Sequence, residues 1–196
     1  MKTLLRPAAS LFVLLTVVTG IAYPLLVTGI AKGAFPEAAN GSLIVKDGKT
    51  VGSRLIGQNF TDPKYFWGRP SATSPQPNNA SASSGSNQGP LNPALVDAVK
   101  GRIDALKAAD PGNTRPVPAD LVNASASGLD PHISVEAALL QLDRICIARH
   151  LNPEMKKQLE NIIPHFTEGR QLGFLGEERI NVLKLNLELD KQFVVR

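Results

Sequence analysis

The residues best suited to chemistry lie in one polar stretch, residues 121–134, which reads LVNASASGLDPHIS. It holds Ser125 and Ser127 together with Asp130 and His132, the residue types that hydrolases combine into a nucleophile, a base and a group that orients the base. The stretch therefore raises two hypotheses. It forms either a serine hydrolase site or a structured loop against which a partner docks.

The sequence around these serines favours the loop. Neither serine lies in the G-x-S-x-G turn that commonly carries a hydrolase nucleophile. The other two histidines, His150 and His165, fall at predicted helix ends, where histidine often acts as a cap. Gly128 suits a turn with positive φ, so we expect it to shape the loop.

Metal, nucleotide and nucleic-acid sites have no support in the sequence. The single cysteine, Cys146, excludes an intrachain disulfide, and the three histidines show no metal-ligand spacing. Neither G-x-x-x-x-G-K-[ST] nor G-x-G-x-x-G occurs, so no recognised phosphate-binding loop is present. After residue 32 there are 18 basic and 17 acidic residues, which leaves no concentrated positive charge for a nucleic acid.

A second group of residues combines aromatic rings with an arginine. The segment FTDPKYFWGRP brings Phe60, Tyr65, Phe66, Trp67 and Arg69 within a dozen positions. Aromatic side chains and arginine dominate the binding energy of protein interfaces. The segment is therefore either a corner of the hydrophobic core or an anchor for a partner.

An uncharged segment of 25 residues, Pro7 to Ala31, precedes both groups. As a helix, this segment would extend about 37 Å, which exceeds a bilayer core of about 30 Å. Leu15 lies in the first half of this predicted span. Pro24 removes one backbone donor and should kink or loosen the second half. We expect a retained transmembrane helix; the alternative is a signal peptide that is cleaved.

The distribution of basic residues predicts the orientation of this span. Lys2, Arg6 and the amino terminus precede it, whereas Lys32 alone follows closely. Because basic residues favour the cytoplasmic side, residues 1–6 should form a cytoplasmic tail and residues 32–196 an extracytoplasmic domain.

The order of local patterns predicts an α+β fold with a small sheet after the membrane helix. Asp47-Gly48 should turn a hairpin, and a Pro/Ser/Asn/Gly-rich loop at 68–92 should be either a linker or a functional loop. Strict alternation of leucines over 183–189 favours a strand, with a strand followed by a short helix as the alternative. Helices are expected from Pro93 until Asp110-Pro111 ends the first, from Ser134 to Arg149, and from Pro153 until Pro164 stops the third.

Five motifs occur in a fixed order behind the span: LIGQNF, YFWGRPSA, SGSNQGPLNP, LVNASASGLDPHIS and NVLKLNLELD. In this combination the chain resembles the C subunit of the Kdp-type potassium-transporting ATPase of bacteria and archaea. The resemblance implies a single-pass inner-membrane protein that is a non-catalytic accessory subunit, needed for assembly and acting as a catalytic chaperone that raises the ATP affinity of the pump.

The resemblance also implies partners and a docking face. The partners are a channel-like potassium-binding subunit, a P-type ATPase subunit that hydrolyses ATP, a small single-span subunit and the lipid bilayer, so potassium and ATP are handled by other chains. The expected docking residues are Gln58, Asn59, Phe60, Trp67, Gly68, Arg69, Pro70, Ser125, Ser127, Gly128 and Asp130. The competing hypotheses are a membrane-tethered extracytoplasmic serine hydrolase and a secreted binding module.

Overall fold

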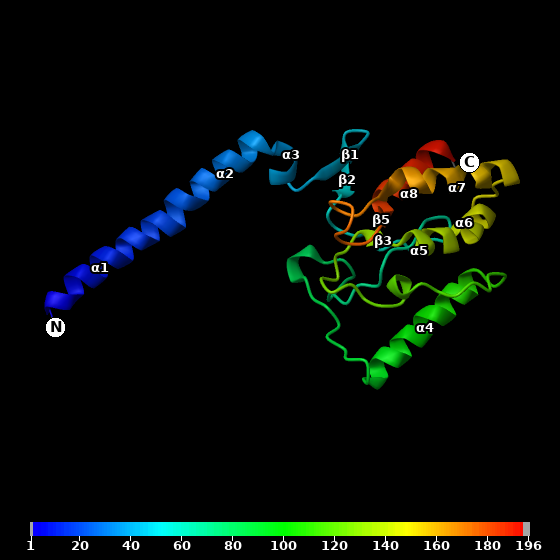
Figure 1. The fold of residues 1–196 in the computed structure, drawn as a ribbon, viewed down its shortest axis with the longest axis horizontal. Coiled ribbons are helices and arrows are strands. Elements are labelled where there is room, and N and C mark those ends of the chain that lie inside the picture. The colour runs from blue at the N-terminus through cyan, green and yellow to red at the C-terminus, as the bar shows by residue number, and fades with distance from the viewer. Residues whose placement is uncertain (1, 194–196) are drawn as a thin grey trace. The chain divides into compact units, whose positions relative to one another are not determined.

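The computed structural model describes residues 2–193 and divides into two compact units, Met1–Val51 and Gly52–Arg196 (Figure 1). Met1 and residues 194–196, at the ends of the predicted tail and domain, lie outside the described residues.

The first unit begins with the predicted apolar helix. It consists of α1 (Lys2–Val17), a π-helical turn η1 (Val18–Ala22) and α2 (Tyr23–Ala34). Over Leu4–Ala34 it is long and apolar enough to cross a membrane. The π-helical turn directly precedes Pro24, which cannot donate a helical hydrogen bond, so the loosening predicted at this proline is found one turn earlier. The limits of the bilayer-embedded part, predicted as 7–31, stay a prediction.

A short helix and the predicted hairpin complete this unit. The helix α3 (Pro36–Ala39) is followed by β1 (Leu43–Lys46) and β2 (Lys49–Ser53), which form a two-stranded sheet. Asp47 and Gly48 have φ values of 52° and 74°, as a two-residue primed turn requires. The hairpin prediction is confirmed.

The second unit contains a small antiparallel sheet and several helices. The strands β3 (His132–Ile133), β5 (Arg179–Asn181) and β4 (Thr167–Glu168) pair in that order. The helical segments are η2 (Ala80–Ala82), α4 (Pro93–Ala109), η3 (Ala119–Leu121), α5 (Val135–Leu140), α6 (Leu142–Ala148), α7 (Pro153–Phe166) and α8 (Val182–Gln192). In Figure 1, α4 lies along one edge of the unit and α7 and α8 along the opposite edge.

The core of this unit lies between the sheet and helices α5 to α8. Its fully enclosed side chains include Phe66, Ile133, Ile145, Leu159, Ile163, Ile180 and Leu185. Helix α4 buries no residue completely, so it contributes surface more than core. The mixed α+β class with one N-terminal apolar helix is confirmed.

Two predicted helix boundaries are corrected. The helix expected from Ser134 to Arg149 is broken at Gln141, whose buried side chain bonds to backbone groups outside the helix. The helix expected to stop before Pro164 instead continues to Phe166. Pro164 withdraws a single backbone donor close to the end of the helix, and in the same turn the Thr167 hydroxyl donates to the carbonyl of Ile163.

The strand favoured for the last element is wrong, and the alternative of a strand followed by a helix is correct. Only β5 is extended, and α8 begins immediately after it. The side chain of Asn181 accepts a hydrogen bond from the Lys184 amide and so caps the helix. The helix buries Val182, Leu185 and Leu189 on one face, which satisfies the apolar pattern better than a short strand would.

Candidate functional site

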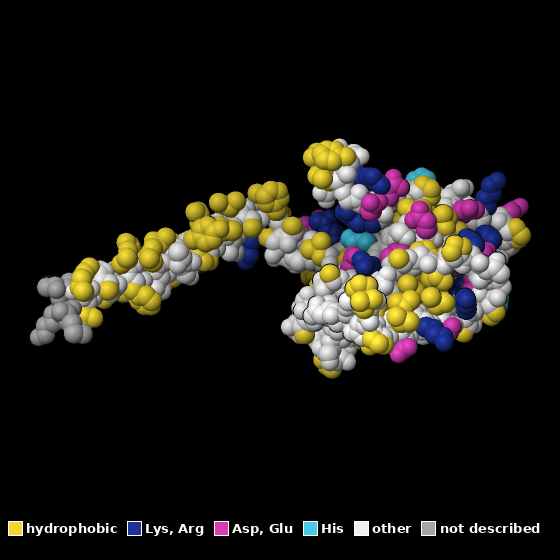
Figure 2. Space-filling view, turned by 60° about the horizontal axis from the view of Figure 1, so that its bottom comes forward, with side chains coloured by type: hydrophobic (Ala, Val, Ile, Leu, Met, Phe, Trp, Pro, Cys, Tyr) yellow, Lys and Arg dark blue, Asp and Glu magenta, His cyan; other side chains and the backbone are white. Residues whose placement is uncertain are grey.

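One concave surface that carries motif residues is a groove of about 430 Å³ in the second unit. One wall is built by residues 58–61 and 67–70, and the other by Arg102, Ala105 and Leu106 of α4, with Leu121 of η3 also lining it. Figure 2 turns the α4 edge of Figure 1 toward the viewer and shows hydrophobic side chains gathered on this face. The groove therefore contains seven of the docking residues expected from the sequence: Gln58, Asn59, Phe60, Trp67, Gly68, Arg69 and Pro70.

Two side-chain amides hold the backbone of Phe66 and Trp67 in place. The Phe66 amide donates to Asn186 Oδ1 at 2.8 Å, and Asn186 Nδ2 donates to the Phe66 carbonyl at 3.0 Å. The Trp67 amide and carbonyl make the same pair of bonds to Gln141, at 2.8 and 3.1 Å. Each amide side chain thus satisfies a backbone donor and acceptor, as a neighbouring strand would.

Two buried arginines hold the segment just before this wall. Arg144 donates to the carbonyls of Pro63 and Tyr65 at 2.6 and 3.0 Å, and its guanidinium lies 4.1 Å from the centre of the Trp67 ring. Burial lowers the pKa of Arg144 to about 10, so it remains charged at neutral pH and the contact is a cation–π interaction. Arg149 donates to the Lys64 carbonyl at 2.7 Å.

The aromatic segment therefore combines both roles considered for it. Phe66 is fully buried and forms a corner of the core. Phe60 and Trp67 are only half-buried and line the groove. Phe66 therefore anchors the segment in the core, while the rings of Phe60 and Trp67 remain accessible at the surface.

The serine-rich stretch packs against the long loop at 68–92. The Ser84 amide donates to the Ser127 carbonyl at 3.0 Å, and the Ser71 hydroxyl donates to the Gly128 carbonyl at 2.7 Å. The Ser125 amide donates to the Pro70 carbonyl at 3.1 Å. The loop is therefore tied to the domain, and the serine stretch supports the groove wall from behind.

Gly128 is required where these two loops meet. Its φ is +68°, and a Cβ atom there would lie 2.6 Å from both the Ser84 carbonyl oxygen and Thr73 Cγ2. We expect Gly128→Ala to lower the free energy of unfolding by about 2 kcal/mol, since both strain and a backbone clash oppose it. Denaturant unfolding of the full-length chain in detergent measures this change.

The matched control for that prediction is Gly101→Ala. Gly101 lies within α4 and has open space around its missing Cβ, so alanine there should stabilise the helix by about 0.5–1 kcal/mol. Equal effects of the two substitutions would contradict the assigned role of Gly128.

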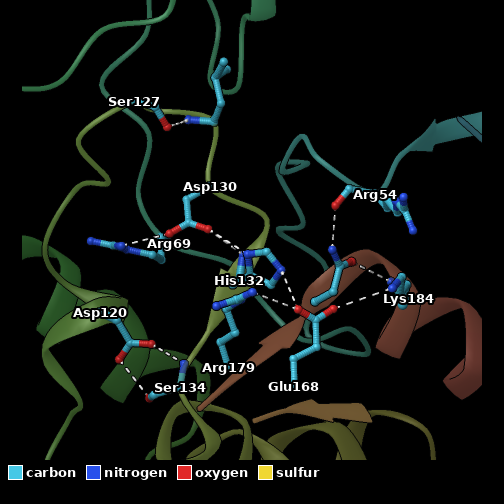
Figure 3. A network of polar contacts seen from close by, with 12 residues as sticks. Arg54, Arg69, Asp120, Ser127, Asp130, His132, Ser134, Glu168, Arg179 and Lys184 are labelled. Atoms are coloured by element: carbon cyan, nitrogen blue, oxygen red, sulfur yellow. Dashed lines mark hydrogen bonds and ion pairs between the residues drawn. The ribbon is translucent and has the colours of Figure 1, made fainter. Parts of the chain in front are cut away.

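Asp130 connects the groove to a polar network (Figure 3). Its carboxylate pairs with Arg69 Nη1 at 3.0 Å and lies 3.1 Å from His132 Nδ1. Burial raises the pKa of Asp130, but hydrogen bonds from the ring and amide of His132 and from Arg69 outweigh it and hold the pKa below its ordinary value. Asp130 is therefore ionised at neutral pH and fixes the position of Arg69.

The network continues from His132 to the edge strand of the sheet. His132 Nε2 lies 3.8 Å from Glu168, which also pairs with Arg179 at 3.3 Å and Lys184 at 3.7 Å. Ionisable side chains from β3, β4, β5 and α8 are thus joined (Figure 3). Because these pairs are partly exposed, the network contributes more to orientation than to stability.

The serine and histidine side chains of the stretch do not meet as a hydrolase triad in the described structure. The Ser127 hydroxyl accepts the Leu129 amide, and the Ser125 residue is only 3% exposed. Both ring nitrogens of His132 face carboxylates, those of Asp130 and Glu168. Within residues 2–193 no group of three His, Cys, Asp or Glu residues could hold a metal ion.

Sequence reasoning did not identify the α4 wall or the two amide side chains. Arg102, Ala105 and Leu106 carry no motif, and only the fold brings them opposite Trp67. Gln141 and Asn186 did give a usable signal, because each is a polar residue on an otherwise apolar helical face.

These features define a class: a protein with one candidate membrane-spanning helix, whose small α+β domain presents a groove as its candidate binding surface. The model of the family described as KdpC, K+-transporting ATPase, c chain, matches residues 5–191. The chain therefore belongs to the KdpC family, as its resemblance in the five motifs indicated.

Curated relatives agree over almost the full length. A potassium-transporting ATPase KdpC subunit from Dechloromonas aromatica (strain RCB) is 75% identical over 190 residues, covering 97% of this chain and 98% of that protein. The subunit of the same name from Polaromonas naphthalenivorans (strain CJ2) is 65% identical, with 97% and 95% covered. That from Variovorax paradoxus (strain S110) is 61% identical over 196 residues, with 100% of both chains covered.

Proposed function

We propose that this chain is a non-catalytic accessory subunit that holds together an ATP-driven, high-affinity potassium uptake complex. Membership of the family supports the assignment of this chain to such a complex. The groove supports a surface through which the chain binds another subunit. The observation that carries the proposal is that residues 58–60 and 67–70 of the groove's aromatic wall come from motifs that indicated the family. The channel-like potassium-binding subunit is the proposed main partner, alongside the P-type ATPase subunit and the small single-span subunit.

The proposed topology places the N-terminus in the cytoplasm and residues 32–196 outside it. The excess of basic residues before the span supports this orientation. The ATP used by the pump would then lie across the membrane from the groove. A chaperone effect that raises ATP affinity would therefore reach the pump subunit through the membrane-embedded parts, as a coupling free energy between two distinct sites.

Purification of the complex from membranes tests this function. With an affinity tag on the ATPase subunit, we expect recovery of the assembled complex to fall when this chain is absent and to return when it is supplied from a plasmid. The KM for ATP of any complex formed without it should be higher. Full assembly with an unchanged KM in its absence would refute the accessory role.

A cysteine placed at Gly112, an exposed glycine with open space around it, tests the orientation. The native Cys146 is buried, so background labelling should be low. A membrane-impermeant maleimide should label the new cysteine in intact spheroplasts. Labelling only after the membrane is opened would reverse the proposed topology.

A further inference from the structure

We propose that the groove binds an extended, acidic segment of a partner protein, with an apolar side chain seated between α4 and Trp67. This inference rests on the proposed accessory function and adds the chemistry of the partner. Its support comes from three properties of the groove: unpaired backbone donors, an arginine without a counter-ion (Arg102) and an apolar lining.

The backbone along one wall is available for hydrogen bonding. The amides of Asn59, Phe60 and Gly68 donate to no other described residue of the chain. Unpaired backbone donors are costly to bury unless a ligand satisfies them. An extended segment offers carbonyls at regular intervals along such a wall, whereas a helix uses its own carbonyls internally. The free amides therefore favour an extended occupant over a helical one.

The charges in the groove are of one sign. Its ionisable lining residues are Arg69 and Arg102, and no aspartate or glutamate lines it. Arg102 is half-buried and donates to the Val122 carbonyl at 2.6 Å, but no carboxylate among residues 2–193 forms an ion pair with it. The Nε atom of Arg69 is enclosed and has no hydrogen-bond partner in that same range.

A carboxylate is the group that best satisfies Arg102, and the nearby Arg69 adds positive charge to the same groove. Guanidinium pairs with carboxylate through strong charge-assisted hydrogen bonds, and the low exposure of Arg102 would strengthen them. Because Asp130 already holds Nη1 of Arg69, this guanidinium is oriented before the partner arrives. Arg102 has no such counter-ion, so it should contribute most to selection of an acidic segment.

Among the other lining residues, Phe60, Trp67, Leu106 and Leu121 supply apolar surface. In an extended segment, alternate side chains point to the same side. The segment should therefore place an apolar side chain among these residues, with an aspartate or glutamate near enough to reach Arg102.

Filling the groove tests where the partner binds. Ala105 lies on the groove wall of α4 and is exposed, so Ala105→Trp should occupy the groove without disturbing the core. In membranes containing all subunits, co-purification of this variant with the tagged complex should fall at least about tenfold. The matched control is Ala108→Trp, an exposed position one turn further along α4 that does not line the groove. Equal retention of both variants would overturn the proposal.

Charge reversal tests the chemistry of the partner. Arg102→Glu should weaken association about tenfold, whereas Arg102→Lys should retain most of it. Lys157→Glu, which makes the same charge change at an exposed position of α7, should have little effect. Equal loss with glutamate and lysine at position 102, or no loss with glutamate, would overturn the assignment of an acidic partner.

A photo-crosslinking amino acid at position 105 in the assembled complex identifies the occupant directly. Mass spectrometry should find a peptide of another subunit with an acidic residue close to an apolar one. Crosslinks to lipid, to a second copy of this chain or to a segment without acidic residues would overturn the proposal. If the unmodified chain itself fails to co-purify, the proposed function fails as well; if it co-purifies regardless of the groove variants, only this inference fails.

Discussion

Replacing Arg149 with methionine is expected to lower the free energy of unfolding by about 3 kcal/mol. Arg149 is buried and donates to the Lys64 carbonyl, to the Phe193 carbonyl at 2.9 Å and to Asp190 at 2.7 Å. Methionine fills similar space without a donor, so two carbonyls lose this partner and Asp190 keeps the hydrogen bond from the Tyr65 hydroxyl but loses its ion pair. The cost is therefore that of groups left unpaired, and the loss of packing contributes little.

Denaturant unfolding of the full-length chain in detergent measures this effect. Trp67 is the only tryptophan, and its emission reports on the segment that Arg149 holds. Lys157→Met removes a positive charge from an exposed position of α7 and should change the free energy of unfolding by less than about 0.5 kcal/mol. A similarly small change for Arg149→Met would show that the hydrogen bonds of Arg149 do not stabilise the folded domain.

The second large effect is expected for Asn186→Leu. Leucine is close to asparagine in size but cannot bond to the amide and carbonyl of Phe66, which are buried with it. Each unpaired buried group costs about 1–3 kcal/mol, so the free energy of unfolding should fall by about 2–4 kcal/mol. The same unfolding measurement applies.

Gln192→Leu provides the comparison for Asn186→Leu. Gln192 is an exposed residue at the end of the same helix, and among residues 2–193 its side chain bonds to Glu188 alone. Its replacement should leave stability nearly unchanged. If the two leucine variants unfolded alike, the paired amide contacts at Phe66 would not explain how the segment is held.

The parts of the fold predicted correctly are those that local chemistry determines. Asp47-Gly48 specifies its turn, and Asn92 and Asn152 cap α4 and α7 with side-chain oxygens. The last element was assigned incorrectly because the leucines at 183, 185, 187 and 189 alternate as a strand while Val182, Leu185 and Leu189 also share a helical face. Only tertiary packing decides between two periodicities that overlap over so few residues.

The candidate site was predictable on one wall only. Trp67 and Arg69 stood out because an aromatic residue and an arginine lie close together among turn residues, and they do line the groove. The serine stretch was also recognised, but its contacts with loop 68–92 depend on backbone bonds that a sequence does not reveal. Arg102 and Ala105 look like ordinary helix surface, since their role depends on which segment faces them.

The pairing of Phe66 and Trp67 with amides on separate helices has a mechanical consequence. Phe66 is fastened to α8 through Asn186, whereas Trp67 is fastened to the junction of α5 and α6 through Gln141. A shift of α8 relative to that junction would therefore pull two adjacent residues in different directions and change the width of the opening beside α4. Substitutions deep between these helices should alter partner affinity even though they touch no surface.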